Sequence, residues 1–336
     1  MSVDGEREPS TSPALEAFGL SGSKTEEVGN IGFDGWATVK YRATAPSGEQ
    51  WLLSITDPRR QFEALRRLRS HLYWLQALDR DTDLVVQVPL SATSGELLVP
   101  VTLPEGERIA SVVTWVDGEN VWFEEDESRS DYQPETLSRI GSLLARIHNH
   151  SEGWGRPDDF VRRDAESEDL ERTLEDLGPA MADGKLSGGD SFQVESTLNA
   201  IYDHLRKIER SPSSRGLLHG DFTGRNCVRL GDDLRPIDFD WCSIGWYLYD
   251  IGWMFSVSDL SAEGRKAVLD GYDSVRPLPG HALRTIEAFE IESTVRYASW
   301  FAEHDGFANL KLHDFLWNEC ARFQSGYPFL LEDDEE

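Results

Sequence analysis

This chain of 336 residues has no long apolar segment, and its first residues do not resemble a secretory signal peptide. No apolar run approaches the roughly 20 residues that a membrane-crossing helix needs. The first residues are polar and acidic, unlike the basic and then apolar start of a secretory signal. We therefore expect a cytoplasmic protein, and a hydrophobic content of 39% gives it material for a large core in two lobes.

Cysteine and basic residues are also scarce. Cys227, Cys242 and Cys320 have no metal-ligand spacing and leave one thiol over in any pairing, so we expect reduced thiols. Lysine and arginine number 33 against 61 aspartates and glutamates, which gives a net charge of −28. This charge repels a polyanion, so nucleic acid is not an expected partner. The acidic residues are scattered, as on the solvated surface of a protein from a salt-loaded cytoplasm.

The composition predicts two lobes between two polar ends. Residues 1 to about 25 are rich in Ser, Glu, Gly and Pro and poor in apolar residues, which predicts a disordered tail. Residues 26–116 are expected to form a sheet-rich N-terminal lobe, and residues 117–330 a larger, mostly helical one. The acidic run 331–336 should fray through self-repulsion. A sheet-rich lobe followed by a mostly helical lobe predicts the α+β fold class.

Hydrophobic periodicity predicts the elements of both lobes. The first lobe should hold a hairpin and one helix, at residues 36–44, 50–56 and 62–78. Further strand-like segments lie at residues 85–88, 96–101 and 110–116. The second lobe should hold helices that start at Pro134 and cover residues 194–208, with one hairpin at 226–240.

Four polar side chains gather around that second hairpin, namely Asp221, Asn226, Asp238 and Asp240. A turn centred on Asp232 would pair residues whose numbers sum to 464, so that Asn226 faces Asp238. Directly opposed residues have Cβ atoms about 4.5–5.5 Å apart, close enough for an amide oxygen and a carboxylate to share a cation. An oxygen site with few protein ligands suits Mg²⁺ held together with substrate phosphates.

Asp221 precedes Asn226 by five residues, in the order His219-x-Asp221-x-x-x-x-Asn226. Kinase catalytic loops have this arrangement, in which the aspartate receives the proton of the acceptor hydroxyl and the asparagine holds a metal ion. Asp238-Phe239 follows where such enzymes place the Asp-Phe pair whose aspartate binds another Mg²⁺. Phosphoryl transfer needs mainly positioning and charge neutralisation, which these side chains can supply.

The runs HGDFTGRN at 219–226, IDFD at 237–240 and YDI at 249–251 resemble the family of aminoglycoside phosphotransferases, choline kinases and homoserine kinases. The likeness extends more weakly to residues 113–118 and 143–148, and it spans about residues 30–325.

This resemblance implies a bilobal, protein-kinase-like fold with ATP bound between the lobes and a small-molecule hydroxyl phosphorylated in the helical lobe. It implies that Asp221 is the base, that Asn226 and Asp238 hold Mg²⁺, and that His219 and Asp250 brace the loop. Asp240 would be a supporting acidic group. The hinge residues of the implied nucleotide site are Thr114, Trp115 and Val116.

The sequence departs from that family on the third strand. Ser54 stands where kinases carry a phosphate-anchoring lysine, and His71 stands where the partner glutamate is expected on the helix. No lysine occurs between Lys40 and Lys185. Three explanations remain: an arginine such as Arg59 or Arg60 reaches back, Lys40 on the preceding strand substitutes, or the anchor is missing. Alternation next to Val39 predicts that Lys40 points to solvent, which favours the arginines.

The segment GNIGFDG at 29–35 has glycines but not the order of a phosphate-covering loop, so we expect a flexible turn there. Three functions therefore compete. The first is an active small-molecule kinase that uses ATP or another nucleotide. The second is a kinase-fold binding protein without activity, a pseudokinase, which the residues Ser54 and His71 favour. The third, a metal-dependent hydrolase, would want more acidic or histidine ligands.

The acceptor is not specified by the sequence. A cation-binding pocket in the helical lobe is one possibility, formed by Trp246, Tyr249, Trp300, Glu303 and Trp317. Aromatic residues at helical spacing are, however, typical of a core.

Overall fold

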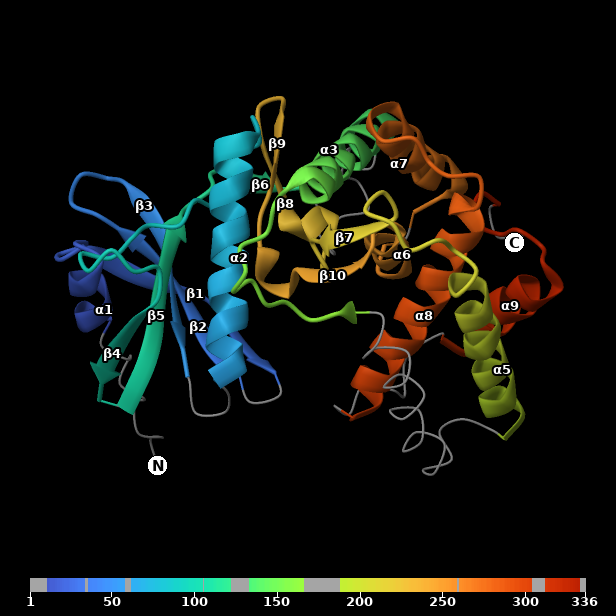
Figure 1. Ribbon diagram of the computed structural model, residues 1–336, viewed down its shortest axis with the longest axis horizontal. Helices are drawn as coiled ribbons and strands as arrows, with labels where there is room; N and C mark the ends of the chain where they lie inside the picture. Colours follow the sequence, from blue (N-terminus) through green and yellow to red (C-terminus); the bar gives the residue numbers. More distant parts are fainter. Residues whose placement is uncertain are drawn as a thin grey trace, which may run out of the picture. The chain divides into compact units, whose positions relative to one another are not determined.

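The computed structural model describes residues 11–33, 36–57, 62–104, 106–121, 133–165, 188–258, 260–303 and 312–332. The chain forms two units, shown in Figure 1 and described separately below. The first comprises Met1–Asp117 and Gly155–Arg162, and the second comprises Gly118–Trp154 and Arg163–Glu336. None of the helices in these ranges is long and apolar enough to cross a membrane.

The first unit is built on a five-stranded antiparallel sheet (Figure 1). Its order is β1-β2-β3-β5-β4, with strands β1 Lys24–Phe33, β2 Trp36–Thr44, β3 Gln50–Thr56, β4 Val99–Leu103 and β5 Gly106–Thr114. The predicted hairpin is confirmed as β2 and β3, because turn-forming residues separate two alternating strands whose register places Thr44 opposite Gln50. The predicted helix is α2, Phe62–Asp81, which extends three residues further than expected.

The expectation of a disordered tail is wrong for residues 11–25. A short helix, α1 Ser12–Ala17, buries Ala14 and Leu15, and Phe18 follows it into the core. These side chains pack with Tyr41, Leu53 and Val112 on one face of the sheet. The segment is polar on average, but Ala14, Leu15 and Phe18 are spaced so that they lie on one side of a helical turn and can be buried together. The glycine-containing segment expected to be a flexible turn is also largely strand, since residues 29–33 end β1.

The smaller strands of this sheet were predicted less well. Residues 85–88 form no strand, and only an isolated bridge joins Pro89 to Val113. A proline donates no hydrogen bond to a ladder, which limits pairing there. β4 begins at residue 99, three residues after the start of the predicted segment 96–101. β5 begins at residue 106 and ends at Thr114, whereas the predicted segment was 110–116.

The second unit is mainly helical. Its described helices are α3 Pro134–Gly153, α5 Gly188–Leu205, α6 Leu248–Ser256, α7 Ala262–Val275, α8 Ala282–Glu303 and α9 Leu312–Ser325. The helices predicted from apolar stripes are confirmed as α3, which begins at Pro134, and α5. α3 and α7 pack along each other, as Figure 1 shows, and α8 packs against α6.

Two small sheets lie in this unit and carry the polar motifs. β7 Arg215–Leu218 pairs with β10 Ser243–Trp246, and β8 Cys227–Leu230 pairs with β6 Glu119–Asn120 and β9 Asp233–Pro236. The hairpin predicted around residue 232 is therefore present as β8 and β9.

Its predicted register is wrong by one residue. Leu230 pairs with Asp233 and Cys227 pairs with Pro236, so that paired numbers sum to 463. The turn contains only Gly231 and Asp232, and Gly231 has a φ of 61°, as tight hairpin turns require. Asn226 thus meets Ile237, whose N–H donates to the Asn226 carbonyl at 2.9 Å, and Asp238 lies one residue beyond.

Candidate active site

The loop 219–226 and the segment 237–242 adjoin the same ladder in the second unit. β7 ends at Leu218, which pairs with Ser243 at the start of β10, so the loop leaves this ladder where the segment enters it. Gly220 has a φ of 82°, and a Cβ added there would overlap the backbone carbonyl of Trp241. Only glycine fits this close approach of the two segments.

Asp250, on the first turn of α6, fixes the backbone of the loop. It is fully buried, and its carboxylate accepts hydrogen bonds from the N–H groups of His219, at 2.8 Å, and Gly220, at 2.9 Å. His148 Nε2 lies 3.1 Å from the same carboxylate. Asp250 therefore holds the backbone at the start of the loop.

His148 is itself fully buried, on α3. Burial lowers its pKa, so that the imidazole is neutral and its Nε2–H donates to Asp250. Its Nδ1 then accepts from the Tyr272 hydroxyl at 2.9 Å, and burial raises the pKa of that hydroxyl, which keeps its proton. A neutral chain of hydrogen bonds from α7 through α3 therefore supports the loop.

His219 joins the two motifs to each other. Its Nε2 lies 2.9 Å from the carbonyl of Ile237, which can only accept, so Nε2 carries the proton. The ring also packs against Phe222 and Phe239. Because Asp250 holds the backbone of His219 and His219 holds residue 237, Asp221 and Asp238 are supported by one connected network.

Asp221 is held by two donors. Trp253 Nε1–H donates to Oδ1 at 2.9 Å, and Asn226 Nδ2 donates to Oδ2 at 2.9 Å. Burial raises the pKa of the Asp221 carboxyl above its ordinary value; the charge of Asp238 adds to the rise, while His219 and the two donors oppose it. A raised pKa makes this carboxylate a better proton acceptor.

Asn226 ends the short helix Gly224–Asn226 and is oriented by the same contacts. Its Nδ2 also donates to the Asp221 carbonyl at 2.7 Å, so the amide group turns its nitrogen toward the loop and leaves its Oδ1 as an acceptor on the other side. Asp238 is half-buried and has a left-handed backbone, with φ of 62° and ψ of 60°. Such strained backbone is found preferentially at functional sites.

The Asn226 oxygen and the Asp238 carboxylate fit a hard cation, because Mg²⁺ prefers oxygen ligands and is usually bound by one or two carboxylates together with phosphates. Asp240 follows in the short helix Phe239–Trp241 and is half-buried. Within the described ranges, no group of three or more His, Cys, Asp or Glu side chains could hold a metal ion.

Trp253 was missed in the sequence. Its signal was present, since it follows Asp250 by three residues on α6, a spacing that puts both side chains on one face of a helix. Asp250 therefore holds residues 219 and 220 while Trp253 holds residue 221.

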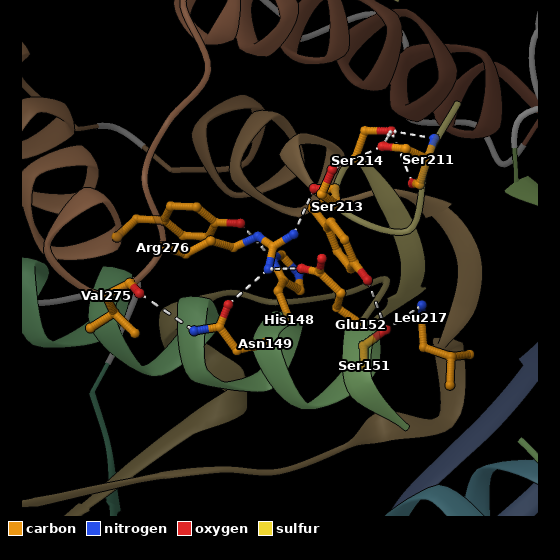
Figure 2. A network of polar contacts seen from close by, with 12 residues as sticks. His148, Asn149, Ser151, Glu152, Ser211, Ser213, Ser214, Leu217, Val275 and Arg276 are labelled. Carbon is orange, nitrogen blue, oxygen red and sulfur yellow. Dashed lines mark hydrogen bonds and ion pairs between the residues drawn. The ribbon is translucent and has the colours of Figure 1, made fainter. Parts of the chain in front are cut away.

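β7 is anchored to α3 and α7 by the network in Figure 2. Arg276 donates to Asn149 and Glu152 of α3, at 2.7 Å and 2.6 Å, and to the Ser213 carbonyl at 2.6 Å (Figure 2). Ser151 accepts from the N–H of Leu217 at 2.6 Å. The strand that carries the loop is thus fixed at its start and along its length.

The remaining predicted residues lie in the first unit, at buried positions of the second unit, or outside the described ranges. Ser54 is in β3, Thr114 ends β5, and Trp115 and Val116 follow it. The N–H of Trp115 donates to the Gln50 carbonyl at 3.1 Å, which ties this segment to β3. His71 is buried on α2. Arg59 and Arg60 lie outside the described residues, as do the side chains of Trp300, Glu303 and Trp317, while Trp246 and Tyr249 are buried.

A family model described as the phosphotransferase enzyme family matches residues 32–283. The chain belongs to this family. The chain is 26% identical to the homoserine kinase of Agrobacterium fabrum over 217 residues, which cover 62% of the chain and 61% of that enzyme. It thus spans about three fifths of the length of the homoserine kinases that it matches.

Two solved structures resemble the chain along most of its length. The microcompartment-associated aminopropanol kinase has a TM-score of 0.69 at 21% identity, over 94% of this chain and 97% of its own. The amicoumacin kinase hAmiN, in complex with AMP-PNP, Ca²⁺ and Ami, has a TM-score of 0.68 at 17% identity, over 91% and 90%. These likenesses confirm the predicted kinase-like α+β fold, with a sheet-rich N-terminal part and a helical C-terminal part.

Proposed function

We propose that this protein moves the γ-phosphoryl group of ATP, or of another nucleoside triphosphate, to a hydroxyl group of a small molecule, with Asp221 as the base. The observation that carries the proposal is the carboxylate of Asp221, held between Trp253 and Asn226 with a raised pKa. A carboxylate fixed in this way can accept the proton of a hydroxyl as phosphoryl transfer proceeds.

The other residues of the site have supporting roles in this proposal. Asn226 and Asp238 would hold Mg²⁺, which when bound neutralises negative charge on the nucleotide phosphates. His219 and Asp250 fix the spacing between the two motifs through the backbone contacts described above. The solved relative in complex with AMP-PNP and Ca²⁺ supports a nucleotide and a divalent cation as ligands in this family. Residues 114–116 are proposed to line the nucleotide site, as the family resemblance implies.

A pseudokinase is the second candidate, and Ser54 and His71 favour it because two residues of the usual phosphate anchor are replaced. The two candidates differ in what Asp221 does. A base matters only where a hydroxyl group is being phosphorylated, whereas a binding protein has no use for one.

The test compares wild type with Asp221→Asn in a nucleotide-consumption assay with Mg²⁺ and a panel of amino alcohols, homoserine, sugars and aminoglycosides. An enzyme should lose turnover by about 10²- to 10⁴-fold in the variant, because the amide cannot accept the proton, while nucleotide affinity stays within a few-fold. Asp232→Asn, in the exposed hairpin turn, is the matched control and should retain wild-type turnover. Nucleotide binding by wild type without transfer to any acceptor would favour the pseudokinase.

A further inference from the structure

Lys40 lies directly across the sheet from Ser54, the residue that replaces the usual lysine. In the ladder between β2 and β3, Lys40 pairs with Ser54, and in the next ladder Ser54 pairs with Ser111 of β5. Directly opposed residues share one face of a sheet, with Cβ atoms about 4.5–5.5 Å apart. Lys40, Ser54 and Ser111 therefore form one polar row across three strands.

This row is on the face of the sheet opposite the α1 core. The strand neighbours Tyr41, Leu53 and Val112 pack with α1, so the alternate residues face the other way. Lys40 is nevertheless only 8% exposed, and Ser111 only 4%. The expectation that Lys40 points to solvent is therefore wrong: alternation placed it on the correct face, but that face is also covered at this position.

An ammonium group loses hydration in a protein interior, so lysine is almost never fully buried unless it is paired, and Lys40 does take part in such contacts. Ser54 has a small side chain, so it leaves room on β3 that a lysine there would fill. The flexible four-carbon stem of Lys40 can extend across that room from the neighbouring strand.

The strand next to Lys40 is also irregular. In the β1–β2 ladder, Glu27 pairs with Tyr41 and Gly29 pairs with Lys40, so Val28 is an extra residue that forms a bulge. Bulges redirect side chains and are frequent beside active sites. The bulge begins the glycine-containing end of β1, which is the part of this hairpin where a ligand could approach the backbone closely.

We propose that Lys40 is the phosphate-anchoring lysine of the nucleotide site, supplied by β2 across the ladder instead of by β3. This inference rests on the proposed function and specifies one binding residue within it. The positive charge that the family carries on the third strand is thus retained on the second strand. The small side chain of Ser54 leaves the space into which the Lys40 side chain extends. The anchor is therefore moved from β3 to β2 and is not lost, and neither Arg59 nor Arg60 is needed to replace it.

The test measures Mg²⁺-dependent binding of ATP and its Michaelis constant in four variants beside wild type. Lys40→Ala should raise both the dissociation constant and the Michaelis constant by about tenfold or more, because a charge-assisted contact to the phosphates is lost. Lys24→Ala is the matched control, since Lys24 is an exposed lysine of the same unit at the start of β1, opposite Thr44, and it should change neither constant more than a few-fold. The Arg59→Ala/Arg60→Ala double variant should likewise bind as wild type does.

The decisive variant is the exchange Lys40→Ser combined with Ser54→Lys, which returns the lysine to the third strand. It should recover most of the affinity that Lys40→Ala loses, a rescue that a merely structural lysine would not give. Melting temperatures near that of wild type establish that all variants are folded. Unchanged constants in Lys40→Ala, or a loss confined to the arginine double variant, would overturn the assignment of Lys40 while leaving the kinase proposal standing. A wild type that binds no nucleotide would overturn both.

Discussion

Trp253 controls both the position and the proton affinity of Asp221. The indole N–H donates to one carboxylate oxygen at 2.9 Å, while Asn226 holds the other. A donor to a carboxylate stabilises the ionised form and lowers the pKa, against the rise that burial causes. Trp253 therefore favours the ionised form of the buried Asp221 carboxyl, which its proposed role as the base requires.

Replacing Trp253 by Phe retains the ring but removes the donor. Turnover should fall by roughly tenfold or more, since a hydrogen bond to a charged group contributes about 1.5–3 kcal/mol. The pKa of Asp221 should rise further, and because the base works only when deprotonated, the acid limb of the profile of kcat/KM against pH should move to higher pH. A lower turnover with an unmoved acid limb would mean that Trp253 acts only through packing.

At the level of single residues, the meeting of the motif segments was predictable. Spacing and resemblance singled out Asp221, Asn226, Asp238, His219 and Asp250, whose segments the structure brings together, while their roles stay predictions. Trp253 was not found, because a tryptophan on an apolar helix is usually core and its hydrogen bond depends on how α6 packs. The burial of Lys40 was missed for a similar reason, since alternation gives the face of a strand but not what covers that face.

Among the strands and helices, the length of one turn explains why the register of a hairpin was predicted wrongly. The hairpin of β8 and β9 was expected from its turn residues, but a three-residue turn was assumed and the chain uses two. Because of this one-residue difference Asp238 does not face Asn226. It lies beyond the ladder, and its backbone is left-handed. Long periodic elements such as α3 and β2 were predictable because many residues repeat the same signal, whereas α1 has six residues and little pattern.

The two glycines with positive φ in these loops should respond differently to alanine. Gly220 has a φ of 82° and no room for a Cβ beside the Trp241 carbonyl, while Gly231 has a φ of 61° and open space. Gly231→Ala should cost only the conformational strain of about 1–2 kcal/mol and leave turnover near wild type.

Gly220→Ala should suffer the same strain and must also separate the two motif segments, so it should lose most turnover and more thermal stability than Gly231→Ala. Activity assays and thermal unfolding of both variants measure the difference. Equal losses in the two variants would show that backbone conformation alone matters and that the close approach to residue 241 does not.

The net charge of −28 acts on the molecule as a whole. Local pairs such as Arg276 with Glu152 and Arg265 with Glu290 neutralise some carboxylates. With 33 basic residues against 61 acidic ones, however, the acidic side chains exceed the basic ones by 28, and this excess has no positive charge to balance it. Mutual repulsion of this kind keeps a protein dispersed in solution but destabilises its compact state.

Salt should therefore stabilise this protein through screening. The Debye length falls from about 10 Å at 0.1 M to about 3 Å at 1 M, so repulsion between surface carboxylates is largely removed over that range. The melting temperature should rise steeply as KCl increases up to roughly 0.5 M and then level off, because screening is by then nearly complete. A neutral osmolyte such as sucrose is the control: it acts by exclusion from the surface and should raise the melting temperature without such a plateau. A melting temperature that stays constant or falls between low salt and 0.5 M KCl would show that the acidic surface is not a net cost to the fold.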